Sequence, residues 1–209
     1  MARMTAVAYT AHDVRNMRVY SYCESGCEFA VLAMEGMLVM EFMDVVRKRY
    51  ACRKYADRQV SKADLDAILE AGRLAPTSTD QQEQHAYVIR SADGLAKVDE
   101  LSECRYGAPT VLMVTYDTTD VYEYPGGEYD SGVEDASIAL THMMLASADR
   151  GVGSCWVNVF DPDKVHEAFR LKKRDRVVAM LDLGYPAADA EPSAKHLRRK
   201  DIADLVTYL

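Results

Sequence analysis

Two clusters of basic residues are the first groups in this sequence that could hold a ligand. They are Arg47, Lys48, Arg49, Arg53, Lys54 and Arg58, and then Lys195, His196, Arg198, Arg199 and Lys200. Guanidinium groups bind phosphate oxygens through two parallel hydrogen bonds, so clusters distant in sequence could share one phosphate if the fold joins them. The alternative, favoured by composition alone, is cations at helix C-termini and a solvated tail.

A second candidate group is the polar run 75–82, which directly follows an apolar helical pattern. Its backbone and side-chain groups could hydrogen-bond a ligand. Taken by itself, however, the run is better interpreted as a loop that ends the helix.

The third group is the stretch 151–161, in which two glycines precede an aromatic strand and permit close backbone approach. No GxGxxG, P-loop or nucleophile-elbow pattern occurs in the sequence. Cys155 lies among apolar neighbours, so we expect a buried, inert thiol rather than a nucleophile.

Composition limits the class of protein. The chain has 209 residues, 49% apolar and 28% charged, which suits one globular domain. Its net charge of −8 argues against nucleic acid or an anionic membrane surface as a partner. No apolar run approaches the roughly 20 residues that span a bilayer. Five scattered cysteines predict neither a disulfide framework nor a metal site, and reduced thiols indicate a cytoplasmic protein.

The pattern of apolar residues from 41 onward predicts an α+β domain. Helices are predicted at 42–50, 61–75, 95–101 and 133–150 and after Asp161-Pro162, and strands at 86–89, 110–116, 154–160 and 177–183. The segment 117–130 is acidic and rich in tyrosine, which is typical of a loop with aromatic side chains available to a substrate. The helix 133–150 is apolar almost all round, so we expect it in a core or an interface and predict a homodimer.

Residues 1–40 show no helical or strand period. Their most apolar stretch, 29–40, contains Glu35 and follows acidic residues where a secretory signal would be positively charged. We therefore expect a poorly ordered extension. Met40 and Met43 stand immediately before the first patterned segment, and we expect one of them to be the true start.

Four segments, in this order, resemble the nitroreductase superfamily. They are Arg49-Tyr50-Ala51-Cys52-Arg53-Lys54-Tyr55, the run 71–77, the run 151–161, and Gly184-Tyr185-Pro186. The resemblance extends over residues 41–209. It implies an α+β fold with a central, mainly antiparallel sheet flanked by helices, and an intertwined homodimer that binds FMN noncovalently at its interface.

The resemblance also implies the cofactor-binding residues. Arg49, Arg53, Arg198 and Lys200 match cations that hold the phosphate and ribityl chain, and the strand 156–159 faces the isoalloxazine ring near N5. The full implied set is Arg49, Tyr50, Ala51, Arg53, Pro76, Thr77, Ser78, Asp80, Gln82, Trp156, Val157, Asn158, Val159, Arg198 and Lys200.

The sequence departs from the family pattern at several of these positions. Tyr50 replaces a frequent Arg or His, and Ala51 replaces a usual Ser, so one hydrogen bond to the flavin tail is missing. Asp80 replaces a usual Asn. Glu83 and Gln84 replace a common Pro-Trp pair.

The implied activity is electron transfer from NADH or NADPH, through flavin N5, to a small nitroaromatic or quinone-like acceptor. Neither an essential acid–base side chain nor a metal is predicted. One alternative is a specialised relative, such as a reductive dehalogenase or a flavin-consuming enzyme of the dimethylbenzimidazole synthase type. Another is a non-catalytic flavin-binding protein, which the departures at Ala51, Asp80 and Glu83 would favour.

Overall fold

The structure is a computed structural model that describes residues 41–209. The expectations about residues 1–40 lie outside this range. Four antiparallel strands form one sheet in the order β1-β2-β4-β3: β1 (Gln84–Ile89), β2 (Thr110–Asp117), β4 (Asp175–Gly184) and β3 (Gly153–Val157). The helices are α1 (Phe42–Lys48), α2 (Lys62–Arg73), α3 (Ala92–Leu101), α4 (Gly132–Asp149) and α5 (Pro162–Phe169), with short 3-10 turns η2 (Ser78–Asp80) and η3 (Ile202–Asp204).

The two central strands hold the sheet together. Strand β2 is buried along almost its whole length because both of its faces are covered, which explains its continuous apolar run. It pairs with β4 from Thr110 opposite Leu183 to Asp117 opposite Asp175, with a bulge between Val114 and Thr115.

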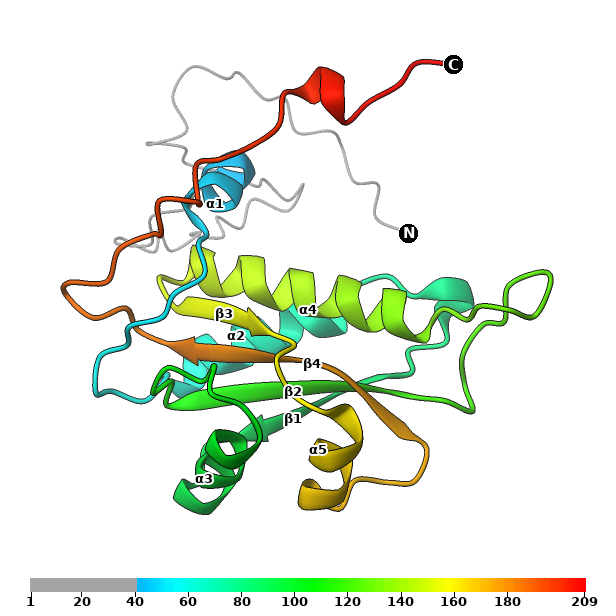
Figure 1. Cartoon of the computed structure of the whole chain (residues 1–209), viewed down its shortest axis with the longest axis horizontal. Coiled ribbons are helices and arrows are strands. Elements are labelled where there is room, and N and C mark those ends of the chain that lie inside the picture. The colour runs from blue at the N-terminus through cyan, green and yellow to red at the C-terminus, as the bar shows by residue number, and fades with distance from the viewer. Residues whose placement is uncertain (1–40) are drawn as a thin grey trace, which may run out of the picture. The chain divides into compact units, whose positions relative to one another are not determined.

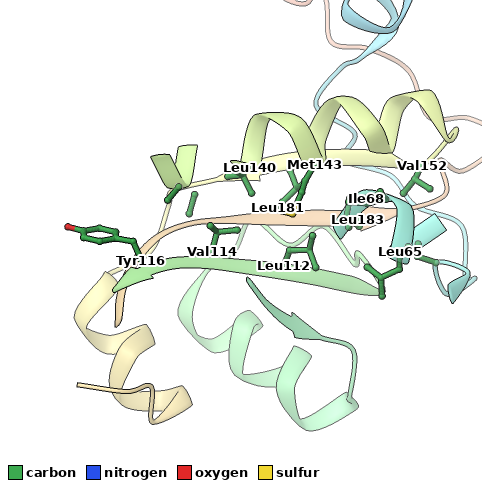
Figure 2. Close-up of a cluster of buried hydrophobic side chains, with 13 residues drawn as sticks. Leu65, Ile68, Leu112, Val114, Tyr116, Leu140, Met143, Val152, Leu181 and Leu183 are labelled. Atoms are coloured by element: carbon green, nitrogen blue, oxygen red, sulfur yellow. The ribbon is translucent and has the colours of Figure 1, made fainter. Parts of the chain in front are cut away.

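Helices cover both faces of the sheet (Figure 1). On one face, α2 and α4 pack against alternate residues of β2 and β4, and Figure 2 shows Leu140 and Met143 of α4 directed at Leu112 and Leu181. On the other face, α3 and α5 pack against the intervening residues of the same strands, whose side chains point the opposite way, including Met113. The alternation of strand side chains thus builds two separate cores.

Capping residues set the helix starts as the sequence predicts. The Ser61 hydroxyl accepts a hydrogen bond from the Asp64 amide at 3.1 Å, and the Asp161 carboxylate accepts one from the Asp163 amide at 3.0 Å. Gly151 follows α4 in the left-handed conformation, with φ of 68°. No helix within residues 41–209 is both long enough and apolar enough to cross a membrane.

The first predicted helix is too long. Helix α1 ends at Lys48, because Arg49 adopts ψ of 126° and the chain then runs extended. Of its apolar residues Val45 alone is buried, whereas Phe42 is 65% exposed and Val46 is also exposed. The predicted apolar face of α1 is therefore mostly uncovered in one chain.

Candidate functional site

The segment after α1 lies against the start of β3. The Cys52 amide donates to the Ser154 carbonyl at 2.9 Å, and Ala51 forms a parallel bridge with Ser154. Gly153 allows this approach, because a Cβ atom there would lie 2.8 Å from the Cys52 sulfur. Gly153 at the start of β3 therefore permits a close backbone approach, as the sequence suggested, and the segment that it admits is the basic one.

A small cavity of about 100 Å³ opens where these two segments meet. Its lining is Lys48, Arg49, Tyr50, Ala148, Gly151, Val152, Gly153, Ser154 and Pro186. Cationic residues in the lining suit an anionic group, since guanidinium groups bind phosphate oxygens.

The second basic cluster approaches the first. The His196 ring nitrogen Nε2 lies 3.2 Å from the Arg47 carbonyl oxygen, and its ring meets the Tyr50 ring edge-on with 6.3 Å between centroids. Arg198 and Lys200 follow on the same exposed segment but do not line the cavity. The fold thus brings the two clusters side by side, through His196 rather than through Arg198 or Lys200.

Arg53 takes a different direction from Arg49. Because α1 ends at Lys48, the two arginines do not share a helical face, contrary to what a continued helix would give. The Arg53 guanidinium instead lies 5.6 Å from the centre of the Tyr106 ring.

The loop from Pro76 to Gln82 has an unusual backbone. Thr79, Asp80 and Gln82 all have positive φ, at 52°, 60° and 54°. Such conformations are costly for residues other than glycine and cluster at functional sites. Internal hydrogen bonds hold the loop, from the Gln82 amide to Thr77 Oγ1 at 3.1 Å and from Gln82 Nε2 to Asp80 Oδ1 at 2.8 Å.

Within one chain this loop is remote from the basic cavity. Ser78 is hydrogen-bonded to Asp135 in the first turn of α4, whereas the cavity includes Ala148 in its last turn. At about 1.5 Å per residue, these two positions are about 20 Å apart along the helix. Figure 1 shows α1 near one end of α4 and the turn that follows α2 near the other.

Strand β3 ends at Val157, three residues earlier than predicted. The Asn158 side chain donates to the Val178 carbonyl at 2.8 Å and accepts a hydrogen bond from the Trp156 indole, so side-chain bonds replace strand pairing there. Val157 is buried, Trp156 is half-buried and Val159 is 66% exposed. The end of the strand therefore presents backbone groups to solvent beside a fixed indole ring.

Comparison with known proteins identifies the family. The model of the nitroreductase family matches residues 46–106 and 101–185. The chain belongs to the nitroreductase family. A nitroreductase family protein from Clostridium difficile is 33% identical, and the structures align over 81% of this chain and 98% of that one with a TM-score of 0.76. The predicted nitroreductase fold is thus confirmed.

Two further relatives carry informative names. A protein from Archaeoglobus fulgidus, provisionally named an NADH dehydrogenase/NAD(P)H nitroreductase, is 31% identical over 70% of this chain and 86% of its own length. A provisionally named nitroreductase from Exiguobacterium sibiricum, solved in complex with FMN, is 22% identical, with a TM-score of 0.71 over 81% of this chain and 98% of its own.

Beneath the loop, this member of the nitroreductase family buries two carboxyl groups that sequence reasoning did not bring together. Glu83 is 5% exposed and Asp135 is 2% exposed, and the two carboxyl groups lie close enough to affect each other's charge. Burial, and then the neighbouring Asp135, raise the pKa of Glu83. The sequence feature that could have pointed to Asp135 is its position as an acid at the start of an otherwise apolar helix.

A third buried acid, Asp182, lies on β4 directly opposite Cys155 of β3. Its Oδ2 atom has no hydrogen-bond partner among residues 41–209. Burial raises the pKa of Asp182 to about 8 and that of Cys155 to about 11, and Cys155 is buried, as expected from its apolar neighbours. The signal for Asp182 was a single acid within a buried apolar strand.

The acidic, tyrosine-bearing segment 117–130 lies at the same end of α4 as the loop 76–82. The Tyr122 amide donates to Ser131 Oγ at 3.2 Å, and the Tyr124 hydroxyl donates to Glu134 on α4. Tyr129 is 67% exposed. The segment is therefore anchored at its base and carries an accessible aromatic ring at its tip.

Proposed function

We propose that this protein is an FMN-dependent oxidoreductase that transfers electrons from NADH or NADPH to a small nitroaromatic or quinone-like acceptor. The observation that carries the proposal is the segment of Arg49, Tyr50 and Ala51, held against Gly153 and Ser154 around a cavity suited to a phosphate. The FMN complex of the Exiguobacterium relative and the name of the Archaeoglobus relative point the same way.

Bound FMN would supply hydride and electron transfer at N5. The chain's own task is to bind and orient it. Arg49 would hold the phosphate, with Arg198 and Lys200 on the adjacent tail, and Ala51 would leave one contact to the flavin tail unmade. The exposed end of β3, from Trp156 to Val159, would border the ring.

A homodimer would complete the site. The loop with Thr77, Ser78, Asp80 and Gln82 and the cavity with Arg49 lie at opposite ends of α4, so a second chain running antiparallel along α4 would place its loop beside the first chain's cavity. Exposed apolar residues on α4 support such packing, among them Val133 at 53% and Ile138 at 38%.

The segment 117–130 would then border the same site as a substrate lid, with the Tyr129 ring able to stack on a planar acceptor. Arg53, which is turned toward Tyr106, would rotate to reach the flavin.

The test begins with the flavin. We expect purified protein to be yellow and to release FMN, not FAD, on denaturation, and to oxidise NADH or NADPH with a panel of nitroaromatic and quinone acceptors. Colourless protein that also fails to bind added FMN would refute the proposal. Flavin that binds but is never reduced by either nicotinamide would show a binding protein instead.

A further inference from the structure

We propose that Glu83 and Asp135 are positioning residues for the loop 77–82: Asp135 holds the loop through Ser78, and Glu83 keeps Asp135 in place by carrying the one proton that the two carboxyl groups share. The inference rests on the proposed function, because it takes this loop as part of the flavin site.

Asp135 is the attachment point of the loop. Its two carboxylate oxygens lie 3.1 and 3.0 Å from the Ser78 amide nitrogen, and Oδ1 also accepts from the Ser78 hydroxyl at 3.2 Å. The carboxylate is almost fully buried in the first turn of α4, where the positive end of the helix dipole favours a negative charge. Asp135 is therefore well placed to accept the hydrogen bonds of Ser78.

The loop needs such an attachment. Three residues just beyond Ser78 hold left-handed backbone conformations that relax unless the surroundings impose them. Release of Ser78 would free the start of this strained segment, and with it the side chains of Asp80 and Gln82.

Glu83 supplies the proton. Its Oε1 lies 3.4 Å from the Ser131 hydroxyl, while no donor among residues 41–209 reaches its Oε2. A proton on the Glu83 carboxyl, donated to Asp135, turns a repulsive contact into a hydrogen bond. Two buried carboxylates in contact cannot both be ionised without a large cost, so the pair holds one proton.

The charges around the pair favour keeping that proton. Glu134 of α4 lies beside the Tyr124 hydroxyl, and this tyrosine in turn neighbours Ser78 and Asp135. Neither 74–84 nor 117–135 contains Lys, Arg or His. Arg73 of α2 shares a cavity with Gln82 but is paired with Glu70 at 2.7 Å.

The consequence is a flavin affinity that depends on pH. When Glu83 loses its proton, two negative charges face each other beneath Ser78 and the loop loosens. Loss of the Ser78 hydrogen bonds to a charged acceptor corresponds to about a tenfold or greater weakening of FMN binding.

The experiment measures the dissociation constant of FMN by flavin fluorescence quenching with apoprotein, from pH 5.5 to 9. We expect wild-type protein to bind about tenfold more weakly above neutral pH than below it. Glu83→Gln, whose amide mimics the protonated acid, should bind tightly at every pH. Asp135→Ala should bind weakly at every pH, and Glu100→Gln on the exposed face of α3 should behave as wild type.

A second readout needs no flavin. In the apoprotein, infrared difference spectra on raising the pH should show one buried carboxylic acid losing its proton near neutrality, and this band should vanish in Glu83→Gln. Circular dichroism checks that each variant is folded. If Asp135→Ala does not fold, Asp135→Asn replaces it, and this variant should bind FMN less tightly than wild type at low pH.

The outcomes separate the two proposals. If no form of the protein binds FMN at any pH, the proposed function is wrong and this inference falls with it. If wild-type protein binds FMN but Glu83→Gln keeps the wild-type pH profile and the infrared band, or if both Asp135 variants bind as wild type does, the inference alone is overturned.

Discussion

The backbone amide of Cys52 lies 2.9 Å from the carbonyl oxygen of Ser154. This bond links the basic segment after α1 to the glycine-rich start of β3, and the cavity that contains Arg49 lies at their junction. The position of the proposed phosphate site would thus depend on a backbone contact between two segments far apart in the sequence.

Arg49 should be the cation on which FMN binding most depends. A charged hydrogen bond to phosphate contributes about 1.5–3 kcal/mol, so Arg49→Ala should weaken FMN binding by roughly ten- to a hundredfold while the dimer stays folded. Arg49→Lys should recover part of this loss, because it keeps the charge but not the two-pronged geometry. Equilibrium titration of apoprotein with FMN measures both.

The matched control is Arg47→Ala. The Arg47 side chain is 68% exposed and contacts Asp44, so its loss should change FMN affinity little. Equal effects of Arg47→Ala and Arg49→Ala would show that the phosphate lies elsewhere along the segment.

The uncovered side of α4 should be the dimer interface. Ile138→Arg would place an unpaired charge there, at a cost of about 3 kcal/mol or more, so the dimer should dissociate at least a hundredfold more readily. Analytical ultracentrifugation at micromolar concentration should show monomers with little bound FMN. Val88→Arg, at a similarly exposed position on the edge strand β1, should remain dimeric; a dimeric Ile138→Arg protein would contradict the proposed interface.

Asp182 should make the protein less stable as pH rises. Its pKa is about 8 in the folded state but about 4 when unfolded, so between these values the folded state binds more protons. The free energy of unfolding should therefore fall from about pH 4 to about pH 8, by up to about 1.4 kcal/mol per pH unit.

Asp182→Asn should abolish this contribution and exceed wild type in thermal midpoint at pH 8, with little difference at pH 4. The exposed Asp189→Asn, which removes only a surface ion pair with Lys54, is the control. Parallel stability curves for wild type and Asp182→Asn would show that Asp182 ionises normally.

A chain that starts at Met40 should fold, dimerise and bind FMN. The family match begins at residue 46, and the elements that build the site all lie within residues 41–209. Gel filtration compares the oligomeric state of the shortened and full-length chains, and the flavin content of the purified proteins compares their FMN binding. Loss of flavin on truncation would show that the preceding residues contribute to the site.

Much of this architecture could be predicted from local pattern. The apolar run of β2 predicted that strand, and the Ser61 and Asp161 caps predicted the starts of α2 and α5, each to within a few residues. Each of these signals is local in the sequence. The end of α1 was not predictable, because the chain leaves the helix at Arg49 so that Ala51 and Cys52 can pair with Ser154 of β3, and no residue nearby in the sequence signals this. The end of β3 was not predictable either, because the Asn158 side chain bonds to the carbonyl of Val178, the β4 residue at the bulge with β2.

The buried acids show the same limit at the site. Glu83 was visible as a departure from the family pattern, but its meaning depends on Asp135, which the fold brings to it from another element. Burial of Glu83, rather than its type or its spacing from other acids, is the main cause of its raised pKa.

The separation of Arg49 from the Ser78 loop along α4 has a genetic consequence, which concerns dimers formed by two differently defective chains. Because each site would draw Arg49 from one chain and the Ser78 loop from the other, a chain defective only in Arg49 and a chain defective only in the loop would each be inactive alone. Brought together in one dimer, they would form one doubly defective site and one wholly intact site. Two inactive alleles of this protein should therefore complement each other to about half of the wild-type activity per mixed dimer.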